Sequence, residues 1–169
     1  MAIERNSRLS EFMANYADVV RIPAPNKARR NLHDLLKSIH ALMHEDCLER
    51  SIKWRFELLP GVFEINIDVN QMEQALINIF KNAVEAIDRN GTMTVRTTAS
   101  PKMLRIIDTG RGLDPDTLAH LLSPFYTTKK DGQGIGLTLV REILANHGLD
   151  FSLKMNPDNK TEFQIIFER

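Results

Sequence analysis

The chain has 169 residues, of which 43% are hydrophobic and 26% charged, which predicts one folded globular domain with a short appendage rather than a disordered chain. Its 22 basic and 22 acidic residues cancel and are interspersed, so no overall field favours nucleic acid or an anionic membrane as a partner. The single cysteine, Cys47, excludes an intrachain disulfide and a cysteine zinc cluster, and it favours a reducing, cytoplasmic location. We expect neither a membrane span nor a signal peptide, because no apolar run approaches the required ~20 residues and the first residues are polar.

Residues 1–25 are predicted to form a helical arm ahead of the main domain, residues 26–169. Apolar side chains recur at helical spacing over residues 5–21, and Pro23 and Pro25 then end the helix. The arm cannot bury this apolar stripe by itself. It either docks on the main domain or pairs with a second copy to form a homodimer, and the pattern leaves both open.

The first part of the main domain is predicted to contain a helix and two strands. The helix covers residues 31–48, with Asn31 as its cap. Residues 52–58 and 62–67 are extended and flank a Pro-Gly pair, so they are expected to form a hairpin.

The second part repeats helices and strands. Residues 70–89 form an amphipathic helix that ends by Gly91. A hairpin should follow over residues 92–107, and then a short helix over residues 116–122. A helix over residues 137–147, ending near His147, and two last strands over residues 151–167 should complete the chain.

Asn78, Asn82 and Glu85 lie along one flank of the apolar face of the helix 70–89, at spacings of four and three. Asparagine is a mediocre helix former, so two of them at this edge suggest a site. An amide oxygen there could enter the shell of Mg²⁺ while phosphates and water supply the other ligands. Either Asn taken singly is better explained as a solvated boundary residue, so the inference depends on the pair.

Asp108 directly follows a predicted strand and is followed by Gly110 and Gly112. A carboxylate in this place can accept a hydrogen bond from an exocyclic amine such as that of adenine, while the glycines let a flat ring lie close to the backbone. The same composition is common in turns, so the motif is only moderately specific.

A third motif is the glycine-rich segment 124–137, which leads into a helix. Its glycines alternate at Gly132, Gly134 and Gly136, and Lys129 and Lys130 precede them. Unpaired N–H groups at a helix start and mobile lysines favour a lid over a polyphosphate, although a flexible linker or helix cap fits the glycines alone. The Walker and dinucleotide loops are excluded, because Leu137 stands where the first needs Lys and the second a third Gly.

In this order, NIFKNAVEAI, DTGRGL, PFYTTK and GQGIGL resemble the N, first-glycine, F and second-glycine boxes of the catalytic ATP-binding domain of sensor histidine kinases, in the GHKL or Bergerat-fold superfamily. The resemblance covers the chain from about residue 31, and the compact lid is similar to that of nitrogen-regulation kinases. It implies an α+β two-layer sandwich whose mixed, mostly antiparallel sheet has helices on one face. It also implies that the arm is the end of a dimerisation and phosphoacceptor hairpin.

The resemblance further implies a role for each matching residue. Asn82, supported by Asn78, would hold Mg²⁺ against the triphosphate of ATP, and Asp108 would bind the adenine amine. Lys129 would neutralise phosphate charge, and Phe125 would anchor the lid. The wider nucleotide-binding set would comprise Glu85, Gly110, Gly112, Leu113, Thr127, Thr128, Lys130, Gly132, Gln133, Gly134, Ile135, Gly136, Leu137 and Thr161. Lys160 replaces the glycine that usually precedes the last of these residues.

Two departures from relatives refine the hypothesis. GHKL proteins that hydrolyse ATP carry a water-activating Glu one helical turn before the magnesium Asn, where this chain has Asn78. The residues after His33 and His44 do not match a phosphoacceptor motif, so we expect these histidines, with His40, on polar helix faces, and His120 and His147 at the surface or as caps.

The chain is therefore predicted to bind Mg–ATP and to transfer its γ-phosphate to a histidine outside this segment, on the acceptor hairpin of the same kinase, in cis or in trans. A response regulator would be the next partner, with no contact to nucleic acid or membrane. Two alternatives stay open, namely a hydrolytic GHKL-type ATPase and a nucleotide-sensing module without transfer activity.

Overall fold

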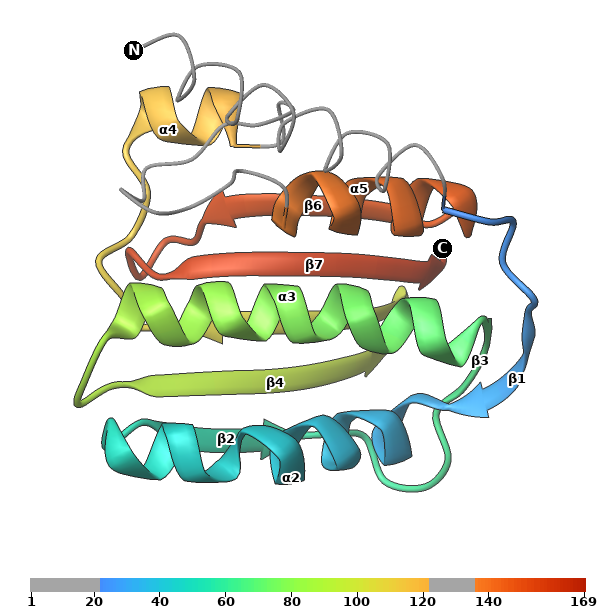
Figure 1. Cartoon of the computed structure of the whole chain (residues 1–169), viewed down its shortest axis with the longest axis horizontal. Helices are drawn as coiled ribbons and strands as arrows, with labels where there is room; N and C mark the ends of the chain where they lie inside the picture. Colours follow the sequence, from blue (N-terminus) through green and yellow to red (C-terminus); the bar gives the residue numbers. More distant parts are fainter. Residues whose placement is uncertain (1–21, 122–135) are drawn as a thin grey trace, which may run out of the picture.

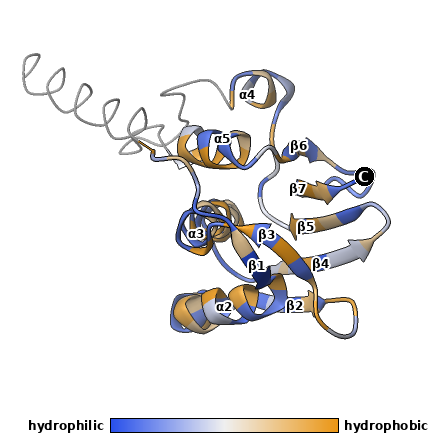
Figure 2. Ribbon diagram, turned by 90° about the vertical axis from the view of Figure 1, so that its right-hand side faces the viewer, coloured by the Kyte–Doolittle hydropathy of each residue, from blue (hydrophilic) through white to orange (hydrophobic). Residues whose placement is uncertain are grey.

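The computed structural model describes residues 22–121 and 136–169, which form a two-layer α+β sandwich (Figure 1). A five-stranded sheet in the order β2-β4-β5-β7-β6 forms one layer, and α2, α3 and α5 cover one of its faces, as Figure 2 shows edge-on. The elements are β1 (Ala28–Asn31), α2 (Leu32–Glu49), β2 (Lys53–Glu57), β3 (Glu64–Ile67), α3 (Val69–Ile87), β4 (Thr92–Ala99), β5 (Lys102–Asp108), α4 (Pro115–His120), α5 (Gly136–Asn146), β6 (Asp150–Met155) and β7 (Thr161–Glu168).

The sheet is mixed and mostly antiparallel, as the family resemblance implies. β2 pairs with β4 in parallel, and the β4–β5, β5–β7 and β6–β7 pairs are antiparallel. β1 and β3 form a separate antiparallel pair beside it. The predicted hairpin of β4 and β5 and the predicted pair of final strands, β6 and β7, are confirmed. Short polar connections between strands favour pairing of strands that are neighbours in the sequence.

The core lies between α3 and the middle of the sheet. Leu76 and Phe80 on α3 are fully buried, as are Val95, Leu104 and Ile165 on the strands behind them. These side chains alternate along each strand and recur every three or four residues along the helix, which is why the apolar periodicity located these elements correctly. None of the helices in the described ranges has the length and hydropathy that a membrane span requires.

The hairpin expected over residues 52–67 is wrong. β2 pairs in parallel with β4, whereas β3 turns away and pairs with β1, a short strand that its sequence pattern did not indicate. The predicted cap of α2 contributes to this, because Asn31 Oδ1 accepts hydrogen bonds from both His33 N (3.2 Å) and Phe63 N (3.0 Å). The chain before β3 is thereby held at the start of α2 instead of returning along β2.

His33 is buried, which corrects its expected position on a polar helix face, whereas His147 directly follows the last residue of α5, in agreement with the expected capping position, and is also buried. His33 is 4% exposed, and its ring nitrogens contact Gly61 O (3.1 Å) and Thr97 Oγ1 (3.0 Å). Burial lowers the pKa of His33, and this effect exceeds the opposing hydrogen bond to Gly61. His147 does lie at the C-terminus of α5, where its Nδ1 contacts Ile143 O (2.7 Å), but it is only 5% exposed.

Candidate functional site

A stripe of three residues on α3 organises the site. Asn78, Asn82 and Ala86 are spaced by four residues, so they follow one another along one flank of the helix, and each is half-buried. The two ends of this stripe contact two different predicted motifs. Ala86 O accepts a hydrogen bond from Arg111 N (3.0 Å), in the loop after β5, whereas Asn78 faces Gly136 at the start of α5. Asn82 therefore lies between the two motifs, ~6 Å along the helix from each contact.

Asp108 lies at the end of β5, where the loop turns back against α3. It is 5% exposed, and its Oδ1 accepts a hydrogen bond from Gly110 N at 2.9 Å. A Cβ atom at Gly110 would lie 2.6 Å from the carbonyl carbon of Ala86, so only glycine allows this approach. The loop is thus pressed onto α3 with the carboxylate beneath it.

The carboxylate of Asp108 is available for a ligand. Burial raises its pKa to about 6, and the hydrogen bond from Gly110 only partly opposes this effect. Within residues 22–121 and 136–169, no protein donor reaches Oδ2. Thr161 of β7 is its direct partner across the sheet, so the two predicted adenine contacts are neighbours. A buried acceptor with one unpaired oxygen fits an amine donor such as the exocyclic amine of adenine.

The start of α5 lies against the other end of the stripe. A Cβ at Gly136 would be 3.3 Å from Asn78 Oδ1, which is closer than most real contacts of this kind. Asn78 Nδ2 donates to Gln74 O (2.9 Å), and its oxygen is the atom nearest Gly136. An amide oxygen and the N-terminus of an eleven-residue helix meet here, as the hypothesis of a phosphate and cation site requires.

Some predicted residues contribute less to this arrangement or lie outside the described ranges. Glu85 is exposed, and Leu137 packs on the core. The residues of the F box and most of the lid fall in 122–135, outside the described residues: Phe125, Thr127, Thr128, Lys129, Lys130, Gly132, Gln133, Gly134 and Ile135. The arm over residues 1–21 is also outside them, so its role stays a prediction.

The structure adds one residue that no motif indicated. Met155, the last residue of β6, accepts a hydrogen bond from Leu113 N at Sδ (3.3 Å), and its methyl group lies 3.0 Å from where a Cβ of Gly112 would be. A thioether at the end of a strand resembles any other apolar residue in the sequence. Only the pairing of β6 with β7 shows that it borders the loop after Asp108.

Comparisons with known proteins identify the family of the chain. Residues 67–169, more than half of the chain, match the family model described as "Histidine kinase-, DNA gyrase B-, and HSP90-like ATPase". The sensor histidine kinase ZraS of Salmonella typhi is 32% identical over 144 residues, covering 83% of this chain and 31% of ZraS. The sensor protein FixL of Bradyrhizobium diazoefficiens is 32% identical over 152 residues, covering 87% of this chain and 30% of FixL. The chain thus spans about a third of the length of these curated relatives.

Solved structures give the same result for the fold. The catalytic domain of histidine kinase ThkA superposes with a TM-score of 0.75 at 26% identity, covering 85% of this chain and 95% of that domain. The chain therefore belongs to the histidine kinase-, DNA gyrase B- and HSP90-like ATPase family, with the fold of a histidine kinase catalytic domain.

Proposed function

We propose that this chain is the ATP-binding catalytic region of a two-component sensor histidine kinase. The observation that carries the proposal is the position of the α3 stripe between the two glycine motifs. Asp108 and its loop lie at one end, and the start of α5 lies beside Asn78 at the other. A nucleotide along this stripe would have its purine amine at Asp108 and its phosphates at α5.

In this proposal Mg²⁺ is held by the nucleotide and by Asn82, with Asn78 in support. The residue types fit a hard cation that keeps several water ligands, since α3 carries the amides of Asn78 and Asn82 along one flank and Asn78 Oδ1 faces the start of α5. The described residues contain no group of three or more His, Cys, Asp or Glu that could hold a metal ion without the nucleotide. Bound Mg²⁺ would neutralise phosphate charge. Lys129 would add positive charge from the lid.

The proposed reaction transfers the γ-phosphoryl group to a histidine outside this segment. A nitrogen of the acceptor imidazole forms the new bond to phosphorus, the bond from phosphorus to the β–γ bridging oxygen breaks, and ADP leaves while the imidazole proton passes to solvent. This chain would contribute positioning and charge neutralisation. His33 and His147 cannot act as acceptors here, because both are buried with both ring nitrogens in hydrogen bonds.

The proposal includes two protein partners. One is the phosphoacceptor hairpin of the same kinase, joined through the arm or supplied by a second copy. The other is a response regulator in the cytoplasm; a structure of histidine kinase ThkA in complex with the response regulator TrrA covers 99% of this chain at 22% identity and a TM-score of 0.75. That complex concerns ThkA, and it supports such a partner here through the shared fold.

The test uses γ-labelled ATP, Mg²⁺ and a separately supplied acceptor hairpin. We expect label on the acceptor histidine and little phosphate release without the hairpin. Steady release of phosphate without an acceptor would favour a hydrolytic ATPase, and ATP binding without transfer would favour a nucleotide-sensing module. No binding of Mg–ATP would contradict the site itself. As a matched pair, Asn82→Ala should abolish Mg-dependent binding with the fold intact, whereas Asn66→Ala, on an exposed position of β3, should not.

A further inference from the structure

We propose that Met155 is a positioning residue of the purine site, which holds the loop 109–113 in the conformation that presents Asp108. The inference rests on the proposed ATP-binding function. It names a residue that belongs to none of the four boxes and lies on the strand after them.

The contacts of Met155 converge on three residues of the predicted nucleotide set. Its Sδ accepts the Leu113 N–H at 3.3 Å, and the Thr161 hydroxyl lies 3.9 Å from the same sulfur. Its Cε lies 3.0 Å from the place of a Cβ on Gly112. These are weak interactions singly, but they bring the end of β6, the end of β7 and the loop together at one side chain.

Met155 packs against the loop at a glycine. Gly112 has φ +75°, a left-handed conformation that an L side chain would strain, and the methyl group of Met155 occupies the space that a side chain would take. The neighbouring residue of the loop, Arg111, donates its N–H to Ala86 O of α3. The loop is therefore clamped between α3 and Met155, with Asp108 at its base.

The position of Met155 predicts an effect on nucleotide affinity rather than on phosphoryl transfer. The contacts of the side chain are with the purine end of the site, whereas Asn78 and Gly136 lie at the other end of the α3 stripe. A more mobile loop should weaken nucleotide binding, because ordering the loop around the Asp108 carboxylate when the nucleotide binds would cost free energy. The phosphates, once bound, should still meet the same groups.

The experiment compares Met155→Ala and Met155→Leu with Met103→Ala. Met103 is the matched control because it is also half-buried, but it lies at the other end of β5 on the sheet face away from the helices. We would measure the Kd for Mg–ADP by calorimetry, the KM for ATP and kcat with the supplied acceptor hairpin, and the melting temperature. For Met155→Ala we expect roughly tenfold weaker ADP binding, equivalent to ~1.4 kcal/mol, and a KM raised by a similar factor with kcat unchanged.

The conservative variant separates packing from the sulfur contact. Met155→Leu keeps the volume but leaves the Leu113 N–H without its acceptor, so it should lose part of the affinity while melting close to wild type. If only Met155→Ala loses affinity for Mg–ADP, Met155 still positions the loop, and it does so by packing rather than through the sulfur contact. Wild-type affinity in both Met155 variants, a fall in kcat equal to the rise in KM, or an equal loss in Met103→Ala would overturn the inference. If the unsubstituted chain fails to bind Mg–ADP, the proposed function fails instead.

Discussion

Asp108 combines deep burial with a charge that the proposed function requires. Its carboxyl is 5% exposed, and burial raises its pKa to about 6, so at neutral pH the folded protein holds a poorly solvated carboxylate. A residue that destabilises the fold and is suited to bind a ligand is typical of functional sites.

Replacing this carboxylate should stabilise the protein while removing its ligand. Asp108→Asn keeps an oxygen for the Gly110 N–H but carries no charge, so we expect the free energy of unfolding at pH 8 to rise by about 2–3 kcal/mol. Denaturant titration would measure this change, and ADP affinity should fall in the same variant because the amide cannot replace the ionised acceptor. Glu45→Gln, on an exposed position of α2, is the control and should change neither quantity. A less stable Asp108→Asn protein would contradict the assigned burial cost.

The same pKa sets a pH dependence with a definite sign. The folded state binds the proton of Asp108 up to about pH 6 and the unfolded state only to about its ordinary value of 3.8, so this residue lowers stability as pH rises from ~4 to ~6. The lowered pKa of His33 acts oppositely, because acid protonates the unfolded state first and favours unfolding below ~6.5. Asp108→Asn should therefore gain stability more steeply between pH 4 and 6 than wild type. Wild-type ADP affinity should decrease as the pH falls below about 6; a flat profile would argue against Asp108 as the amine acceptor.

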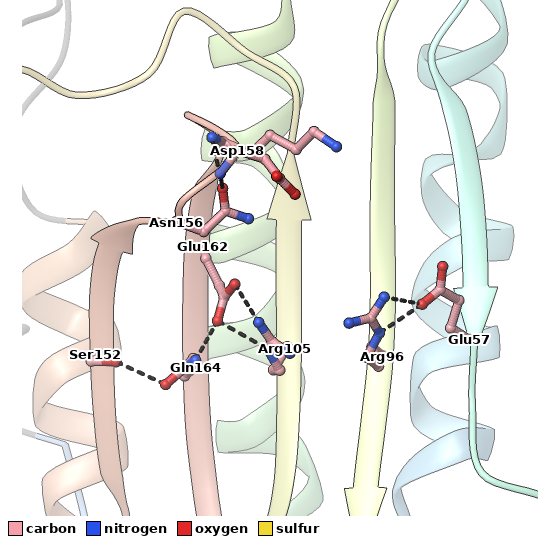
Figure 3. Close-up of polar contacts among 9 residues, drawn as sticks. Glu57, Arg96, Arg105, Ser152, Asn156, Asp158, Glu162 and Gln164 are labelled. Carbon is pink, nitrogen blue, oxygen red and sulfur yellow. Dashed lines mark hydrogen bonds and ion pairs between the residues drawn. The ribbon is translucent and has the colours of Figure 1, made fainter.

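At the scale of elements, the sheet face away from the helices carries two Arg–Glu pairs that differ in burial (Figure 3). Arg105 of β5 donates to both oxygens of Glu162 on β7, at 2.9 and 2.6 Å, and the glutamate side chain is completely buried. Burial disfavours its charge, but hydrogen bonds from Arg105 and Gln164 outweigh burial and lower its pKa. The second pair, Arg96 and Glu57, joins β4 to β2 with both side chains more than a third exposed, at 39% and 34%.

These two pairs should contribute very differently to stability. Glu162→Ala leaves the Arg105 guanidinium without its buried partner, and we expect a loss of about 3 kcal/mol in unfolding free energy. Glu57→Ala removes the corresponding partner on the same sheet face, but solvent screens that pair, so the loss should be ~1 kcal/mol or less. Equal losses from the two substitutions, measured by denaturant unfolding under one condition, would refute the role assigned to burial.

At the scale of the whole molecule, the segment that leads out of the predicted arm is hydrogen-bonded to the start of α3 and to the end of α5. Gln71 Nε2 near the start of α3 donates to Pro23 O (2.9 Å), and Asp68 Oδ2 accepts from Asn26 N (2.9 Å). Lys27 Nζ donates to His147 O (2.9 Å) at the end of α5. Because α5 begins at Gly136 beside Asn78, the linker is connected through α5 and α3 to both ends of the candidate site.

Asp68 is the residue whose loss should release this segment. Its Oδ1 also caps α3 by accepting from Asn70 N (3.1 Å) and Gln71 N (3.2 Å), so Asp68→Ala should cost about 1–2 kcal/mol. The amide of Asn26 should then exchange with solvent markedly faster, as hydrogen-exchange measurements would show. Asp114→Ala removes the corresponding cap of α4 and is the control, which should leave exchange at Asn26 unchanged. Unaltered exchange in Asp68→Ala would show that the linker is held by other contacts.

The sequence alone determined where most of the helices and strands lie, and it supplied the hypothesis of which residues bind the nucleotide. Periodicity placed α2, α3, α5 and the strand pairs β4–β5 and β6–β7, because these patterns depend on neighbours in the chain. The family resemblance assigned Asp108, Gly110 and Thr161 to one end of the site, and in the structure Gly110 and Thr161 both lie next to Asp108.

Only the tertiary structure decided which strands pair with strands distant in the sequence, and which side chains outside the motifs lie at the candidate site. β2 pairs in parallel with β4, and β1 pairs with β3, because distant segments bury those edges. His33 and Met155 gain their roles from Thr97 and Leu113, which lie 64 and 42 residues away in the sequence. A local pattern cannot encode such partners, since they exist only once the sheet has assembled and brought the segments together.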